Sequence, residues 1–179
     1  MEVHFQFNGK EYADSIIRNY ITSKEFKKNF IIKVIIYVAL ILLSALRIRY
    51  RTIRYSVFIV GFVGLFFIRK ITLNNFKKEL YKSHRIKNDD IRVMNIKLEE
   101  NFLTVGEIME ERKYSYDAVQ EAYVIGEYLY IKFIKNDIAF VHSRAFRDAD
   151  CTKAFVTQLE NKANIKVYRK NNVPLKTNN

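Results

Sequence analysis

Two apolar segments separated by a short arginine-rich turn constrain this chain more than any other feature of its sequence. The segments cover residues 30–46 and 55–68. Neither segment has the polar face that a helix on the surface of a soluble protein shows. The pattern therefore predicts a hairpin of two membrane helices, with a soluble part of the chain after it. The turn between the segments carries four arginines: Arg47, Arg49, Arg51 and Arg54.

Both segments are short for a membrane crossing. At about 1.5 Å per residue they reach roughly 25 Å and 21 Å, whereas a hydrocarbon core of about 30 Å usually takes about 20 apolar residues. Lys33, Arg54 and Arg69 extend this reach, because long basic side chains can place their charge among the headgroups. Gly61 and Gly64 would let two membrane helices approach closely. The alternative is a buried helical hairpin in a soluble protein, but so small a chain has little core in which to bury both helices all round.

The net charge of +12 belongs to the half of the chain that carries the apolar segments. Residues 1–88 contain 17 Lys and Arg against 5 Asp and Glu, whereas residues 89–179 contain 14 of each. A nucleic-acid-binding domain would carry a basic excess of its own, so we expect no nucleic-acid partner. The basic flanks of the hairpin instead predict that both termini lie in the cytoplasm. The same residues either serve this topology alone or also contact lipid headgroups: Lys24, Lys27, Lys28, Arg69, Lys70, Lys77 and Lys78.

The remaining segments show other patterns. Residues 1–29 predict a short strand and an amphipathic helix, and residues 71–88 predict a basic linker helix after the hairpin region (30–70). From residue 91 the apolar period changes to two, and polar turns separate short strands. A last helix with Asp148 as its N-cap and an apolar stripe completes a domain over 89–167, and residues 168–179 are predicted to be disordered. The predicted strands cover 91–98, 102–105, 111–116, 118–125, 128–134 and 138–142.

These patterns predict an α+β membrane protein. A two-helix transmembrane hairpin is followed by a small antiparallel β-barrel or bent sheet, which a C-terminal helix closes. The stripe on that helix consists of Cys151, Phe155, Leu159 and Ala163, which recur every four residues. Periodicity alone does not distinguish the pleckstrin-homology-like barrel from other small α+β folds.

Residues 114–146 contain aromatic motifs that can be compared with a known family. The first reads YSYDAV (114–119), an aromatic hairpin follows at 123–130, and the last reads VHSRAF (141–146). In these motifs the chain resembles the YcxB-like family of bacterial membrane proteins, whose members often read W-S-D-I and I-P-K-R-A-F at the two points. The resemblance implies two N-terminal membrane helices, a C-terminal pleckstrin-homology-like domain and a place in the bacterial inner membrane. The family has no established activity to carry over.

The sequence contains no arrangement of residues that predicts catalysis or a metal site. His4, His84 and His142 lie far apart, and Cys151 is the single cysteine. We therefore expect no enzymatic activity, no metal and no cofactor. Arg144 and Arg147 flank Phe146 before the last helix, and they are our candidates for contact with an anion or a partner. The alternative is a solvated turn that places Phe146 in the core.

Three classes of function are compatible with these sequence features. The first is a membrane-anchored binding or scaffold module, whose cytoplasmic domain holds a protein partner or a lipid headgroup through, for example, an exposed strand edge. The second is an accessory subunit of a transporter or signalling complex, in which the hairpin is the interface and Gly61 and Gly64 contact partner helices. The third, a membrane-bound enzyme, would need a cluster of polar residues in a pocket.

Overall fold

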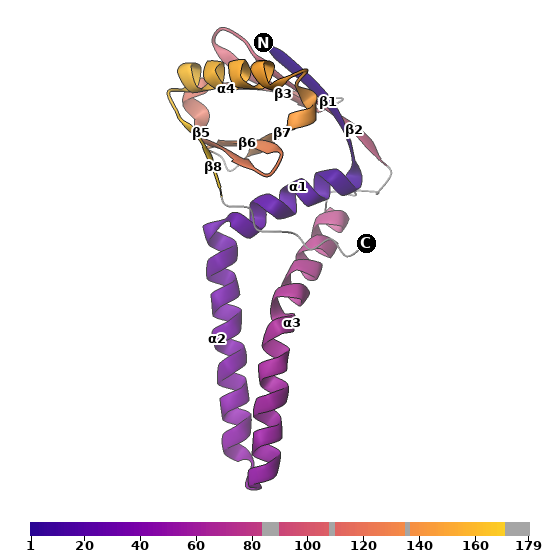
Figure 1. Cartoon of the computed structure of the whole chain (residues 1–179), viewed down its shortest axis with the longest axis vertical. Helices are drawn as coiled ribbons and strands as arrows, with labels where there is room; N and C mark the ends of the chain where they lie inside the picture. Colours follow the sequence, from indigo (N-terminus) through magenta and orange to yellow (C-terminus); the bar gives the residue numbers. More distant parts are fainter. Residues whose placement is uncertain (84–89, 108–109, 135–136, 171–179) are drawn as a thin grey trace. The chain divides into compact units, whose positions relative to one another are not determined.

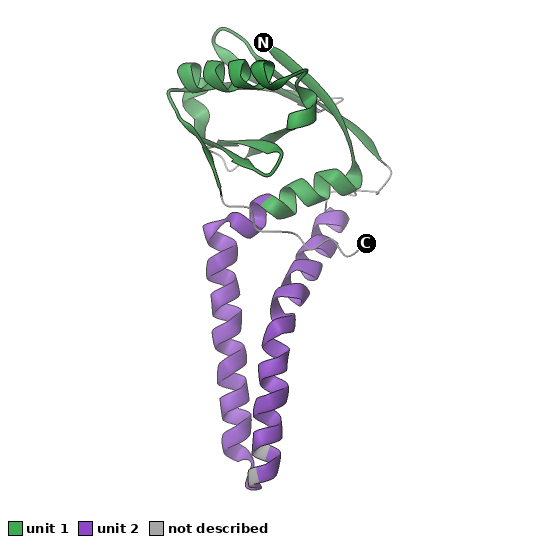
Figure 2. Ribbon diagram, viewed as in Figure 1, with its two compact units in different colours: residues 1–18, 87–179 green, residues 19–86 purple. Residues whose placement is uncertain are grey.

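The computed structural model describes residues 1–83, 90–107, 110–134 and 137–170, without the side chains of Arg51, Arg54 and Glu107. The described elements follow in the order β1, α1, α2, α3, β2 to β7, α4 and β8 (Figure 1). They form two compact units, one of residues 1–18 with 87–179 and one of residues 19–86 (Figure 2). The helical unit therefore interrupts a β-rich unit whose first strand precedes it in the sequence.

Two long apolar helices, α2 (Lys24–Arg47) and α3 (Arg51–Ser83), form a hairpin in the helical unit (Figure 1). Ser23 caps the start of α2, since its side chain accepts a hydrogen bond from the backbone N–H of Phe26 over 3.0 Å. α3 is 33 residues long, so the second apolar segment and the basic helix expected after it are parts of one helix. The Arg69-Lys70 pair between them does not interrupt it, because both residue types favour helix.

The first sheet of the β-rich unit has the order β1-β2-β3-β4, with antiparallel neighbours throughout. Val3 lies opposite Ile96 and Phe5 opposite Met94, so alternate residues of both strands face the core. We expected β1 to belong to a separate N-terminal segment. It belongs instead to this sheet, because its inward residues complete the apolar face of β2. The strands are β1 (Glu2–Asn8), β2 (Ile91–Leu98), β3 (Phe102–Glu107) and β4 (Glu110–Ser115).

The second sheet has the order β7-β6-β5-β8, and β8 runs parallel to β5. The backbone N–H of Lys170 also donates to the carbonyl oxygen of Val124 over 3.0 Å. The prediction of a disordered tail is therefore wrong for residues 168–170, because these residues pair with β5. Residues 171–179 lie outside the described residues. The strands are β5 (Val119–Ile125), β6 (Tyr128–Phe133), β7 (Ile138–His142) and β8 (Val167–Arg169).

The helices α1 (Gly9–Thr22) and α4 (Ala149–Ala163) both begin with side-chain caps. α1 begins directly after Asn8, the last residue of β1. There the Asn8 side chain accepts from the N–H of Glu11 over 2.9 Å, and the Glu11 carboxylate accepts from the N–H of Asn8 over 3.1 Å. At α4, Asp148 is the N-cap as predicted, because its carboxylate accepts from the N–H of Cys151 over 2.7 Å.

The core of the β-rich unit is largely aromatic. Its largest fully buried side chains include Tyr123, Tyr130 and Phe133. The apolar stripe predicted on α4 faces this core, since Phe155 and Leu159 are 0% exposed. The hydroxyl of Tyr130 donates to the carbonyl oxygen of Ser15 in α1 over 2.9 Å. This buried bond ties the first part of α1 to the second sheet.

Candidate functional site

The hairpin exposes apolar side chains on nearly every outward face. Leu46 is 77% exposed and Phe66 is 72% exposed. Monomeric soluble proteins rarely expose apolar patches of more than a few hundred square ångströms, so this surface is the first candidate for function. Other residues of the exposed apolar surface are Ile31, Ile35, Ile36, Leu40, Leu43, Ile59, Val60, Phe62, Val63 and Phe67.

A narrow seam joins the two helices and leaves their other faces outward. Its residues recur every three or four positions, the spacing of an antiparallel coiled coil. On α2 the seam consists of Phe26, Phe30, Val34, Tyr37, Ile41 and Ala45. On α3 it consists of Val57, Gly61, Leu65, Ile68, Thr72, Phe76 and Leu80.

Gly61 and Gly64 pack closely against side chains of α2. A Cβ atom built on Gly61 would lie 2.6 Å from Cδ1 of Ile41, and one built on Gly64 would overlap the hydroxyl of Tyr37. Both glycines therefore face α2 of the same chain. A partner helix would have to contact other residues of the hairpin than the two glycines we named for that role.

The predicted headgroup lysines lie at the base of the hairpin, which is formed by the start of α2 and the end of α3. Tyr20 stacks on Phe76 there, with ring centroids 3.9 Å apart. Residues 26–78 contain eleven Lys and Arg and no Asp or Glu. Eight of these cations lie toward the two ends of the hairpin, and Lys33, Arg69 and Lys70 lie within its apolar surface. Lys24, Lys27, Lys28 and Lys78 are exposed, and Lys77 is half-buried with its Nζ 5.7 Å from the ring centroid of Tyr81.

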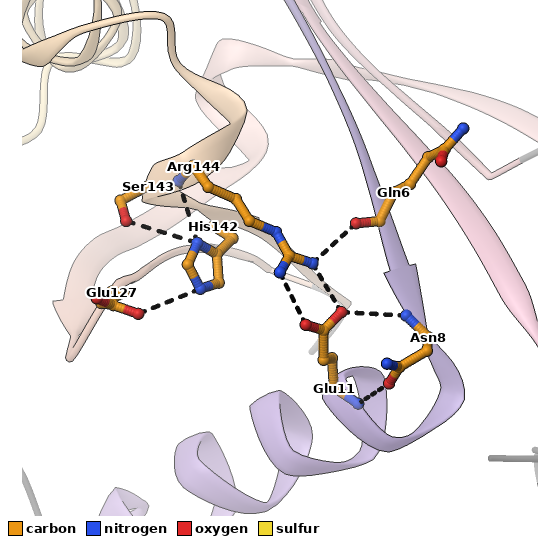
Figure 3. A network of polar contacts seen from close by, with 7 residues as sticks. All are labelled: Gln6, Asn8, Glu11, Glu127, His142, Ser143 and Arg144. Atoms are coloured by element: carbon orange, nitrogen blue, oxygen red, sulfur yellow. Dashed lines mark hydrogen bonds and ion pairs between the residues drawn. The ribbon is translucent and has the colours of Figure 1, made fainter. Parts of the chain in front are cut away.

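Arg144 takes part in a polar network of the β-rich unit rather than standing free (Figure 3). It lies in a 3₁₀ turn after β7 and donates to both carboxylate oxygens of Glu11, over 2.8 Å and 2.7 Å. It also donates to the carbonyl oxygen of Gln6 over 2.9 Å. The hydrogen bond from Arg144 lowers the pKa of Glu11. The charge that we offered for an anion or partner is thus balanced within the chain.

His142 supports the same network. Its Nδ1 accepts from the backbone N–H of Arg144 over 3.1 Å, and its Nε2 lies 3.3 Å from a carboxylate oxygen of Glu127 (Figure 3). Burial, followed by the nearby Arg144 charge, lowers the pKa of His142. Arg147, the second candidate, is exposed, and Phe146 beside it is buried in the core.

A groove lies beside β4, the edge strand of the first sheet. Tyr114 stacks on Phe133 with ring centroids 3.9 Å apart and donates from its hydroxyl to Asp137 over 3.2 Å. Because an edge strand has backbone groups without a neighbouring strand, it can accept an added strand from another chain. The groove is lined by Arg112, Lys113, Tyr114, Ser115, Ala118, Phe133, Ile134 and Asp137.

The titratable residues give no metal or thiol site in the part of the chain that the structure describes. His4 lies 3.1 Å from Glu2 on the surface, and His84 falls outside the described residues. Cys151 is half-buried, and its pKa is raised, first by the hydrogen bond to the Asp148 carboxylate and then by burial. A thiol with a raised pKa is a poor nucleophile.

No family model, curated protein or solved structure matches this chain. Membership of the YcxB-like family therefore stays a prediction.

Proposed function

We propose that this chain is a membrane-anchored binding or scaffold module. In this proposal α2 and α3 cross the bilayer as a pair, and the β-rich unit lies in the cytoplasm of a bacterial cell. One observation carries the proposal. Both helices are of membrane-spanning length, and their apolar side chains are exposed rather than packed in a core. Each large apolar side chain left in water forgoes about 1.5–3 kcal/mol of burial free energy, which a hydrocarbon environment would supply.

The connectivity of the β-rich unit supports the paired crossing. β1 precedes the hairpin and β2 follows it, yet the two strands pair over their whole length. Both ends of the hairpin must then lie on one side of any membrane, so the number of crossings is even. The lysines at the base, Lys24, Lys27, Lys28, Lys77 and Lys78, favour the cytoplasm for that side.

The β-rich unit would be the binding module. Two four-stranded sheets, with α4 between the last two strands β7 and β8 in the sequence, are in keeping with a pleckstrin-homology-like domain, as the resemblance to the YcxB-like family implies. The free edge of β4 and the groove beside it offer an extended peptide both backbone hydrogen bonds and an aromatic floor. We assign the module no catalytic activity.

A second proposal is an accessory subunit whose hairpin binds the helices of a transporter or signalling complex. Since Gly61 and Gly64 face α2, such an interface would use the outward faces. Phe62 and Phe66 pack edge to face on one of them, with centroids 5.6 Å apart. Substituting these two residues with leucine distinguishes the proposals, because it would weaken such a complex while leaving a peptide bound at β4.

Fractionation of cells that express the full chain with a C-terminal tag tests membrane anchoring. We expect the protein to stay in the membrane after carbonate extraction, and the tag to resist protease in spheroplasts. Release by carbonate would overturn the anchoring proposal. A tag that protease removes from intact spheroplasts would overturn the cytoplasmic placement alone.

A further inference from the structure

Three cations interrupt the apolar surface of the hairpin. Lys33 on α2 and the pair Arg69 and Lys70 on α3 are exposed. They are not at the ends of the apolar surface, since Ile31 (56% exposed) and Ile71 (56% exposed) continue it toward the base. Charged side chains within a membrane helix are rare and mark functional positions, so these three need an explanation.

The packing of the seam places the three cations at one level. Gly61 lies against Ile41 and Gly64 lies against Tyr37, which fixes the antiparallel register of the two helices. One helical turn further toward the base, Lys33 comes level with Ile68 and Arg69. The cations therefore form one belt around the hairpin rather than two unrelated positions.

In the described part of the chain, no carboxylate pairs with the cations of this belt. The nearest carboxylates in the sequence on either side of residues 26–78 are Glu25 and Glu79. Among the described residues, Lys33, Arg69 and Lys70 have no hydrogen-bonding or ion-pair partner. A counter-anion from outside the chain would have to be compatible with an apolar surface above and below the belt.

We propose that Lys33, Arg69 and Lys70 bind the phosphate groups of anionic phospholipids, with the acyl chains lying along the apolar surface toward the tip (residues 48–50). This inference rests on the proposed membrane insertion. Arginine holds phosphate oxygens in a bidentate fork, and lysine adds a compact charge. Phospholipid is the ligand whose anionic group and apolar chains match both parts of this surface.

The belt also defines how thick a bilayer the hairpin fits. Between the belt and the tip, residues 34–46 of α2 and 55–68 of α3 are uncharged. At about 1.5 Å per residue this stretch is about 20 Å long, whereas a typical hydrocarbon core is about 30 Å thick. The phosphates held by the belt would therefore lie deeper than those of the surrounding leaflet, and the bilayer would be thinned around the hairpin.

Lipid retention by the full chain tests the proposal. The protein is reconstituted in bilayers of equal parts phosphatidylcholine and phosphatidylglycerol, extracted in mild detergent, and its retained lipids are identified by native mass spectrometry. The test variant is K33Q/R69Q/K70Q. The control is K10Q/K153Q/K166Q, which removes the same charge from exposed positions outside the hairpin.

We expect the wild type to retain phosphatidylglycerol in preference to phosphatidylcholine, even after a wash at about 1 M salt, where the Debye length is about 3 Å. The belt variant should lose about 100-fold in this preference, since each cation near anionic headgroups contributes a factor of about five. The control should change it severalfold at most. If both variants lose this preference equally, or if neither variant loses it, the proposed lipid site at the belt is wrong.

Three further outcomes show which of the two proposals fails. If soluble glycerol phosphate displaces the retained lipid, the site binds phosphate without acyl chains, and the assignment to phospholipid is wrong. If carbonate releases the wild-type chain from membranes, the proposed anchoring fails first. If the chain is anchored but retains both lipids alike, only the lipid inference fails.

Discussion

The two units of this chain place their apolar side chains in opposite directions. In the β-rich unit, aromatic residues such as Tyr123, Phe133 and Phe155 are buried between the sheets and α4. In the helical unit, the buried apolar residues among those described are Ile21, Phe26, Ala45 and Leu80. The β-rich unit thus has a buried apolar core, whereas the hairpin has a thin seam and an apolar exterior. The two units therefore differ in what their apolar side chains face.

The largest expected effect comes from removing residues 1–18, which hold β1 and the first part of α1, from the β-rich unit. Val3, Phe5 and Phe7 are almost fully buried. At about 1.5–3 kcal/mol for each side chain, their loss approaches the total stability of about 5–15 kcal/mol of a typical domain. We expect a fragment of residues 87–179 to show no cooperative thermal unfolding by circular dichroism.

A joined protein that keeps β1 and omits the hairpin gives the control for this prediction. It consists of residues 1–18 connected to residues 87–179 by a short glycine-serine linker. This joined protein should be soluble and unfold cooperatively. If the fragment of residues 87–179 unfolds at the same temperature as the joined protein, then residues 1–18 are not an essential part of the core. The contrast between a β-rich unit with a shared buried core and a hairpin with an exposed surface would then be wrong.

The second effect concerns the seam of the hairpin. Gly61→Leu or Gly64→Leu would force a side chain into Ile41 or Tyr37, at a cost of about 1–3 kcal/mol. We expect these variants to lose hairpin packing, measured as detergent-induced unfolding of the full chain in micelles. Val60→Leu and Val63→Leu add bulk at exposed positions (70% and 50%) and should unfold like the wild type. The unfolding of the β-rich unit should be unaffected in all four variants.

The third effect is smaller and belongs to the surface of the β-rich unit. The side chains of Glu11 and Arg144 are 30% and 47% exposed, so solvent screens their ion pair. A double-mutant cycle with Glu11→Gln and Arg144→Gln in the joined protein should give a coupling of about 0.2–1 kcal/mol. Arg147→Gln should leave the free energy of unfolding unchanged. A coupling of zero would mean that the network in Figure 3 contributes nothing to stability.

The smallest effect is a dependence of stability on pH. The pKa of His142 is lowered below its ordinary 6.5 in the folded chain. The unfolded chain therefore takes up the proton more readily, and stability declines as the pH falls below about 6.5. The pKa of Glu11 is lowered below 4.5, so its contribution is present above that pH and lost below it. Urea unfolding of the joined protein from pH 7.5 downward measures both declines, and His142→Gln should abolish the first.

The local elements could be predicted from the sequence because their signals are local. The period of two and the polar turns predicted β2 and β7 with their observed bounds, and the N-cap at Asp148 is confirmed by its bond to Cys151. The length of α3 was underestimated, because a change from apolar to basic residues alters the surface of a helix but does not end it.

The pairings between distant residues could not be predicted in the same way. Alternation in β1 indicates a strand but does not say that β2, on the other side of the hairpin, is its partner. Glu11 and Arg144 are 133 positions apart, and no local pattern links them. The seam between α2 and α3 could not be recognised in the sequence, because the apolar parts of both helices are apolar on all faces. Hydropathy therefore does not distinguish the face that packs against the other helix from the faces that point outward. β8 is too short to show a period.

The pairing of β1 with β2 also imposes an order in time. The backbone of Met1 bonds to that of Leu98, 97 positions later, and everything between them must be synthesised first. At roughly 5–20 residues per second, β1 waits for several seconds with its apolar face uncovered, while the hairpin leaves the ribosome. The sheet closes only when β2 emerges beside it. The first sheet therefore cannot close before the whole hairpin has been synthesised.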